Sequence, residues 1–401
     1  MLKVLQISNK APYPDNDGSS IAIYNMANGF LDNGVLLHLI TINTKKHFKP
    51  DANVPEDFKK NSNYLSIFKN TSTGLLGALL NLFSTQSYFV SRFYFKEFEE
   101  ALIKKLNEVE FDIVQLEGLF VGVYLKAIKK HTKAKIILRA HNLEYLIWER
   151  HLTNEKSFVK KKYFKLQTER LKLFELKIIN EVDAVVSITD IDKKYIEKTF
   201  PQKPVFTCIT GVNIKDYQSK SDSNIKEKTI FSFSSMDWMP NQEAVDWFLK
   251  NCWETINKAV PDCRFIIAGR NMPARFQRLT LPNILVIENV KSAKDFYNNH
   301  EIMLVPLLSG SGLRIKIIEG MAYGKAIVST SIGAEGIKIT SGKNIQIANT
   351  AQEFSNAVIT LLNNPGQRMA LEKEARQFAF EEFDNKKVVS KLIGFYNSLN
   401  A

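Results

Sequence analysis

Short apolar runs alternate with amphipathic segments along most of this chain. Each run has the length of one strand, and the segment after it usually carries apolar residues at helical spacing. The predicted strands are residues 3–8, 35–42, 112–116, 136–138, 183–187, 205–209, 229–234, 265–268, 284–287, 302–305, 326–330 and 344–348. Because strands that alternate with helices form parallel sheets covered on both faces, the pattern predicts the α/β class.

The longer segments between these runs predict helices. Single helices are expected at residues 21–31 and 242–258. Residues 144–180 contain neither Gly nor Pro, which predicts one or two continuous helices. Residues 351–400 are mostly helical by composition, with breaks expected at Pro365-Gly366 and Phe383-Asp384. Residues 45–63 are polar and show no clear period.

A polar segment divides the chain. Residues 214–226 are rich in Ser, Lys and Asp, a composition typical of a linker. We therefore expect an N-terminal domain over residues 1–213, a C-terminal domain over 227–383 and a last helix over 384–401. A length of 401 residues is enough for two domains with sizeable cores.

The stretch from residue 305 to 337 has the pattern of an anion-binding site. An apolar run that ends at Leu308 leads into a glycine-containing turn and then a helix-forming segment. Glycines let backbone N–H groups approach a ligand, and a helix N-terminus favours negative charge. Two cations, which we expect to be mobile, follow the turn, so a diphosphate would suit the site. The candidate groups are Ser309, Gly310, Ser311, Gly312, Leu313, Arg314 and Lys316.

Glu319 lies further along the same predicted helix. A carboxylate there could accept hydrogen bonds from both hydroxyls of a ribose. Alternatively, Glu319 pairs with Lys316 at i and i+3 as a solvated ion pair. Ala322, Gly324 and the strand at residues 326–330 indicate that this helix is buried against a sheet, which favours the ligand.

These residues resemble the donor-site signature of the family-four glycosyltransferases. The matching segments are PLLSGSGLRIK, Glu319-Gly320-Met321-Ala322, Gly324 and Gly333-Ala334-Glu335-Gly336. The resemblance implies the GT-B architecture, in which two Rossmann-like doubly wound domains face each other across a cleft and the last helix packs back on the first domain. It makes Glu319 the second glutamate of the family's pair, and Ser311 stands in place of the first. A GSG-x-R-x-K pattern is typical of one branch.

The resemblance extends to two further loops. Gly18 follows the first strand, where the family has a glycine loop that meets the donor diphosphate; from the residues alone, Gly18 could equally be the turn glycine before a helix. Residues 236–241 contain no basic residue, although many family members place an Arg and a Lys there. We infer that Arg314 and Lys316 supply that charge.

His141 follows the predicted strand at residues 136–138. A lone histidine is more often structural than catalytic. This one stands at the carboxyl edge of a parallel sheet, where ligands bind, and its His-Asn-x-Glu pattern resembles the family's N-domain histidine motif. The resemblance places His141 at the donor sugar or the acceptor, so His141, Arg314 and Lys316 are the expected catalytic residues. The acceptor-side candidates are Glu117, Asn142, Glu144 and Arg92.

The net charge of +12 is uneven. Between Lys126 and Lys177 there are 15 basic residues against 5 acidic ones. No nucleic-acid-binding motif accompanies them, so nucleic acid is not the expected partner. An anionic membrane surface, a phosphate-bearing acceptor or ordinary solvated lysines all fit this charge. The apolar segment at residues 74–83 could lie in a membrane interface, close over an acceptor or form a buried helix.

Hydropathy and cysteine content limit the cellular locations that fit this sequence. No apolar run is long enough to span a bilayer, and residues 1–8 read as a strand rather than a signal sequence. We therefore expect a cytoplasmic protein, with peripheral contact to the inner face of the membrane as an option. Cys208, Cys252 and Cys263 are too irregularly spaced for a disulfide framework or a metal site.

The resemblance implies a retaining, metal-independent hexosyltransferase without a cofactor. It would move a sugar from a nucleoside diphosphate sugar to a glycan or lipid-linked acceptor, with surface polysaccharide as the family's commonest product. In this family a donor phosphate oxygen can take the acceptor proton. Two alternatives remain, because fold does not determine function. One is a nucleotide-sugar-binding protein without transferase activity, which Ser311 suggests, and the other is a nucleotide-sugar epimerase or hydrolase.

Overall fold

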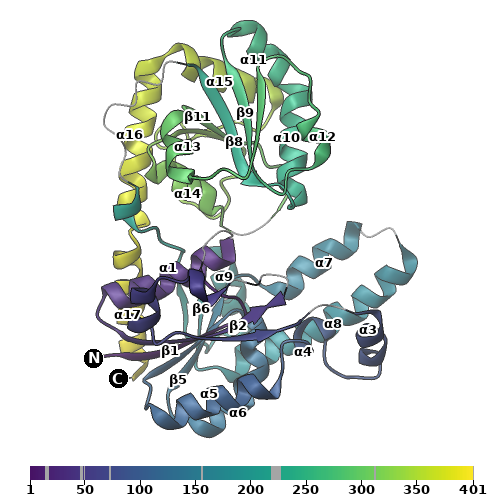
Figure 1. The fold of residues 1–401 in the computed structure, drawn as a ribbon, viewed down its shortest axis with the longest axis vertical. Helices are drawn as coiled ribbons and strands as arrows, with labels where there is room; N and C mark the ends of the chain where they lie inside the picture. The colour runs from purple at the N-terminus through teal and green to yellow at the C-terminus, as the bar shows by residue number, and fades with distance from the viewer. Residues whose placement is uncertain are drawn as a thin grey trace. The chain divides into compact units, whose positions relative to one another are not determined.

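The computed structural model of the chain describes residues 1–13, 18–45, 48, 50–71, 74–154, 157–217, 227–310 and 313–400. The chain divides into two compact units. The first comprises Met1–Gly211 together with Asn385–Ala401, and the second comprises Val212–Asp384. Each unit contains one sheet whose strands are all parallel, so the predicted α/β class is confirmed (Figure 1).

The first unit is built on a seven-stranded sheet with the order β3-β2-β1-β4-β5-β6-β7. The order reverses between β1 and β4, which is the point where a doubly wound sheet usually binds its ligand. Its strands are β1 (Lys3–Ser8), β2 (Leu36–Thr44), β3 (Leu65–Lys69), β4 (Ile113–Glu117), β5 (Lys135–Ala140), β6 (Ala184–Ser187) and β7 (Val205–Thr207).

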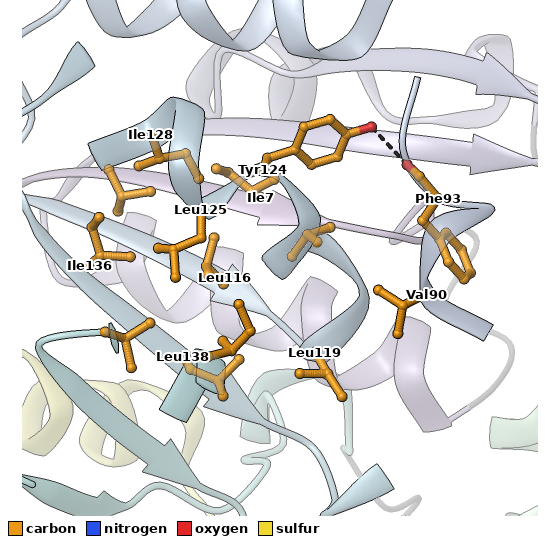
Figure 2. Close-up of a cluster of buried hydrophobic side chains, with 14 of the residues drawn as sticks. Ile7, Val90, Phe93, Leu116, Leu119, Tyr124, Leu125, Ile128, Ile136 and Leu138 are labelled. Carbon is orange, nitrogen blue, oxygen red and sulfur yellow. Dashed lines mark hydrogen bonds between the residues drawn. The ribbon is translucent and has the colours of Figure 1, made fainter. Parts of the chain in front are cut away.

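Helices cover both faces of this sheet, and each face has its own apolar core. They are α1 (Gly18–Asp32), α2 (Glu56–Asn61), α3 (Leu75–Asn81), α4 (Tyr88–Ser91), α5 (Lys96–Glu108), α6 (Leu125–His131), α7 (Glu144–Asn154), α8 (Phe158–Glu181), α9 (Asp190–Thr199) and α17 (Asn385–Asn400), with short 3₁₀ turns at Asp51–Asn53 and Leu119–Tyr124. Figure 2 shows one core, in which Tyr124 packs beside Leu125 and donates a 2.7 Å hydrogen bond to the Phe93 carbonyl.

Helix α17 belongs to the first unit although it comes last in the chain. It lies against α1, where Gly29 leaves room for it: a Cβ at Gly29 would lie 2.3 Å from a methyl group of Val389. The Asn385 amide donates to the Asn25 carbonyl at 2.6 Å. Close backbone approach and a hydrogen bond from a side-chain amide thus hold α17 against the helices that cover the first sheet.

The second unit repeats the design with a six-stranded sheet, ordered β10-β9-β8-β11-β12-β13. The order reverses between β8 and β11. Its strands are β8 (Thr229–Ser235), β9 (Arg264–Arg270), β10 (Ile284–Glu288), β11 (Ile302–Val305), β12 (Ala326–Ser329) and β13 (Gln346–Ile347). Its helices are α10 (Met239–Asn251), α11 (Trp253–Ala259), α12 (Ala274–Gln277), α13 (Ala293–Asn299), α14 (Ile315–Ala322), α15 (Ala351–Asn363) and α16 (Pro365–Glu382), with a 3₁₀ turn at Ile214–Asp216.

The structure corrects several sequence predictions. Strand β3 was not predicted, because it lies at the sheet edge and its residues are only partly buried. The single helix expected at residues 242–258 is two helices, since Cys252 leaves the helical conformation at φ −122°. Residues 214–217 are not a free linker, because Tyr217 is buried in the second unit; residues 218–226 lie outside the described part of the chain.

Candidate functional site

The strand order of the second sheet reverses between β8 and β11, and we call this place its switch point. It brings several of the expected donor-binding groups together. Strand β8 pairs with β11 in parallel, so both strands end at the same edge. The end of β8 supplies Ser234 and Ser235, and the loop after β11 leads to Arg314, the residue that caps α14. Asn241 in the first turn of α10 reaches the same place. Ligands of open parallel sheets bind at such an edge.

Lys316 is held between a residue near the end of β8 and one in the first turn of α10. Its Nζ donates to Ser234 Oγ at 2.8 Å and to Asn241 Oδ1 at 2.9 Å. Removal from water, together with the nearby positive charge of Arg314, lowers the pKa of Lys316 to about 7. Both causes disfavour the ammonium form, and the negative charge of a bound anion would oppose their effect on the pKa.

Arg314 is buried, with 6% of its surface exposed, and its guanidinium lies over the Trp238 ring at 5.2 Å from the centroid. Gly310 makes this possible, because it has φ +112° and a Cβ there would lie 2.7 Å from Arg314 Nη2 and 2.8 Å from the Trp238 ring. Burial lowers the pKa of Arg314. The expectation that Arg314 and Lys316 are mobile cations is therefore wrong, since both are fixed by packing or hydrogen bonds.

Glu319 lies half-buried one turn after Lys316 on α14. Its Oε1 accepts a hydrogen bond from the Tyr217 hydroxyl at 3.5 Å. The Tyr217 ring packs against Tyr323, with the ring centroids 4.7 Å apart. Lys316 and Glu319 are both described, and no ion pair joins them, because Lys316 is bonded to Ser234 and Asn241 instead. The alternative of a solvated Lys316–Glu319 pair is thus wrong.

The other expected donor contacts are placed as follows. Ser309 is exposed and its Oγ donates to Glu243 Oε2 at 3.0 Å. Leu313 is half-buried. Ser311 and Gly312 lie outside the described residues. Gly18 is exposed and is the first residue of α1 in the first unit.

A separate polar cluster occupies the switch point of the first sheet. Glu117 ends β4 and pairs in register with Arg139 on β5. Glu117 Oε2 accepts from Arg139 Nη1 at 3.0 Å and lies 2.7 Å from His141 Nε2. Although burial opposes ionisation, the charge of Arg139 and the hydrogen bonds from His141 and Arg139 lower the pKa of Glu117 to about 2. Because an ionised carboxylate only accepts, Nε2 of His141 carries its proton, and Nδ1 has no partner among the described residues.

This cluster extends into the sheet and to the last helix. Gln6 on β1 donates to Glu117 Oε1 at 2.8 Å, and Gln115 on β4 also donates to it. The hydroxyl of Tyr396 on α17 donates to Gln115 Oε1. Glu117 is fully buried, so it cannot contact an acceptor. The structure corrects that assignment: Glu117 positions His141.

The other acceptor-side candidates lie near the surface of the first unit. Asn142 is half-buried after β5, and Arg92 is half-buried with its guanidinium over the Phe93 ring. Burial raises the pKa of Glu144 to about 7. Buried Glu175 on α8 accepts from the backbone N–H groups of residues 144 and 145, at 3.0 and 2.9 Å, and so anchors the start of α7.

The sequence did not predict the residues that hold the expected site residues in position. They are Ser234, Trp238, Asn241 and Tyr217 in the second unit and Arg139, Gln6, Gln115, Glu175 and Tyr396 in the first. Arg139 alone had a local signal, since a charged residue within an apolar strand requires a partner. The others are ordinary polar or aromatic residues whose role depends on distant contacts.

The described residues contain no group of three or more His, Cys, Asp or Glu placed to hold a metal ion. None of the helices in them is both long and apolar enough to cross a membrane. The expectations of metal independence and of a cytoplasmic location stay predictions.

Comparison with known proteins agrees with this geometry. Residues 227–364 match the family model described as "Glycosyl transferases group 1". A Klebsiella pneumoniae protein named "Uncharacterized 44.6 kDa protein in cps region" is 24% identical, over 98% of this chain and 99% of its own length.

Two solved structures share the fold of the whole chain. Sucrose-phosphate synthase (tll1590) from Thermosynechococcus elongatus superposes with a TM-score of 0.71 at 14% identity, covering 100% of this chain and 99% of its own. Anabaena Alr3699/HepE in complex with UDP and glucose has a TM-score of 0.66 at 13% identity, covering 99% and 100%. The predicted GT-B fold is confirmed, and the family match supports a glycosyltransferase.

Proposed function

We propose that this chain is a retaining glycosyltransferase that moves a sugar from a nucleoside diphosphate sugar to a glycan or lipid-linked acceptor. The observation that carries the proposal is the pair of cations at the start of α14, Arg314 and Lys316, beside the end of β8 and the start of α10. Burial lowers the pKa of Lys316, and the charge of Arg314 lowers it further. Two buried neighbouring cations raise the free energy of the folded protein when no anion is bound, and a bound anion offsets this cost.

The proposed chemistry uses these two cations. In transfer, the acceptor hydroxyl oxygen forms a bond to the anomeric carbon while the bond from that carbon to the diphosphate breaks. The electron pair stays on the departing diphosphate, where Arg314 and Lys316 stabilise the new charge. The acceptor proton passes to a donor phosphate oxygen, so no carboxylate base or metal is needed. Loss of one such contact typically costs about 10²–10³ in rate.

Two further roles belong to the proposal. Glu319, already oriented by Tyr217, accepts hydrogen bonds from the ribose hydroxyls of the donor. His141 presents Nδ1 to the sugar or the acceptor, because its Nε2 is engaged by Glu117. A uridine nucleotide is the first donor to test, since the Anabaena neighbour holds UDP. The Klebsiella relative is named for its cps region, which supports a role in surface polysaccharide synthesis.

Thermal unfolding with a panel of nucleoside diphosphates and their sugars tests the donor site. A ligand at a hundred times its Kd stabilises by about 2.7 kcal/mol. We expect a shift specific to one nucleotide that is lost in Lys316→Ala and Glu319→Ala, both still folded. Arg275→Ala is the matched control, because Arg275 is an exposed cation of the same unit paired with Asp246.

Turnover then separates the alternatives. Transfer of the sugar to an acceptor, lost in the same variants, supports the proposal. Binding without any turnover would favour a nucleotide-sugar-binding protein, and conversion of the donor without an acceptor would favour an epimerase or hydrolase. Full activity in Lys316→Ala would overturn the assignment of the site.

A further inference from the structure

In the first unit, helix α3 and the turn after it expose apolar side chains. Phe83 is 93% exposed, Leu80 64% and Leu79 58%. The alternative of a buried helix at this segment is therefore wrong for its outer face. We call Leu79, Leu80, Leu82 and Phe83 the apolar tip. An exposed apolar group of this size usually marks a binding surface.

The apolar tip is fixed in place by α8 (Figure 1). Arg170 donates from Nη1 to the Asn81 carbonyl at 3.0 Å and from Nη2 to the Leu82 carbonyl at 3.1 Å. Buried Gln167 donates to Asn81 Oδ1 at 2.9 Å. Two of these hydrogen bonds hold backbone carbonyls and the third holds the side chain of Asn81, all from one helix, so the exposure of the tip's side chains is part of the fold.

The N-terminal turns of α8 add positive charge to the same region. Lys160, Lys161, Lys162 and Lys165, the lysine tract, are exposed, and within the described part of the chain none of them forms an ion pair. Lys162 lies over the ring of Phe158, which is 71% exposed. At about 1.5 Å per residue, Lys165 is only about 8 Å along the helix from Arg170.

We propose that the apolar tip and the lysine tract together bind an anionic lipid bilayer. Projecting Leu and Phe side chains beside free lysines are the composition of interfacial membrane segments. The cores of protein interfaces instead favour Tyr, Trp, Met and Arg and are depleted in Lys. All of these residues belong to the first unit, so the inference does not depend on the donor site.

Sedimentation of the full chain with sucrose-loaded vesicles tests this inference. We expect binding to vesicles with about a third phosphatidylglycerol, weak binding to pure phosphatidylcholine, and loss of binding in high salt. Each lysine near an anionic surface is worth about fivefold in affinity, so Lys160→Gln/Lys161→Gln/Lys165→Gln should weaken binding by about a hundredfold. Leu80→Ser/Phe83→Ser should weaken it at least tenfold.

Matched controls come from other helices of the first unit. The triple variant Lys130→Gln/Lys194→Gln/Lys198→Gln removes the same charge, and Ile191→Ser removes an apolar side chain that is 59% exposed. We expect both controls to bind like wild type, and the donor-induced thermal shift to be unchanged in every variant.

Three outcomes would overturn the inference. Binding could be absent with anionic vesicles, or the tip and tract variants could bind no worse than their controls. Alternatively, light scattering could show wild type as a dimer that Leu80→Ser/Phe83→Ser converts to a monomer, and the tip would then be an interface between two copies of the chain.

Discussion

His141 Nε2 lies 2.7 Å from Oε2 of Glu117, a carboxylate with no exposed surface. Arg139 reaches the same oxygen at 3.0 Å, and this pairing keeps Glu117 ionised in the interior. The contact therefore fixes both the ring orientation of His141 and the nitrogen that carries its proton. In the proposed function, His141 serves the chemistry and Glu117 holds His141 in place.

Substitutions at these two residues should have opposite consequences. His141→Ala leaves the Glu117–Arg139 pair intact, so we expect a small loss of stability, about 1 kcal/mol, and a large loss of turnover. Glu117→Gln leaves the Arg139 charge buried without its counter-ion, which should cost about 3–5 kcal/mol. Chemical unfolding and donor turnover measure the two effects. A strongly destabilised His141→Ala protein would argue against this division of roles.

Lys316 should make donor binding depend on pH. Its pKa in the free protein is about 7, and a diphosphate favours the charged form, so binding takes up a proton above that pH. Donor affinity should fall by about tenfold per pH unit above 7. Calorimetric titration between pH 6 and 9 measures this slope. Lys316→Met should bind weakly with a flatter profile, and an unchanged slope in that variant would refute the assignment.

The stability of the free protein should respond to Lys316 in the opposite direction. The folded pKa is below the unfolded value of 10.5, so between pH 7 and 10.5 the unfolded state binds more protons. The contribution of this group to stability therefore rises with pH in that window and is lost as pH falls through 7. The difference between wild type and Lys316→Met in urea unfolding should show this trend.

Gly310→Ala should weaken donor binding without unfolding the protein. At φ +112° an alanine is strained, and its Cβ would collide with Arg314 Nη2 and the Trp238 ring. We expect a cost of about 1–3 kcal/mol in stability and at least tenfold in donor affinity. Gly342→Ala is the control, since Gly342 has φ +79° but no atom within 4 Å of its Cβ. Equal losses of affinity in both variants would show that strain alone is responsible.

Tyr396→Phe should reduce turnover from a distance. It removes the hydroxyl bonded to Gln115 Oε1, and that buried oxygen then lacks its partner at a cost of about 1–3 kcal/mol. Because Gln115 also donates to Glu117, we expect slower turnover at saturating donor with an unchanged donor Kd. Tyr94→Phe removes an exposed hydroxyl bonded to Glu99 and should have no effect. A weaker donor Kd in Tyr396→Phe would contradict the proposed route through His141.

Sequence patterns were sufficient for most of the fold. The strand at residues 302–305, the glycine turn and the helix that carries Glu319 could be predicted because the pattern that buries a strand or helix repeats within a few residues. Strand β3 and the break at Cys252 could not, because an exposed edge and a single non-helical residue leave little trace in that pattern.

The sequence by itself determined which side chains could serve a nucleotide-sugar site, namely Arg314 and Lys316 for the diphosphate and Glu319 for the ribose. Only the tertiary structure decided their state. Lys316 is held by residues 75 and 82 positions earlier, and Tyr396 reaches Gln115 across 281 positions. A charge is desolvated, paired or oriented by whatever lies within a few ångströms of it, and the fold alone brings such neighbours together.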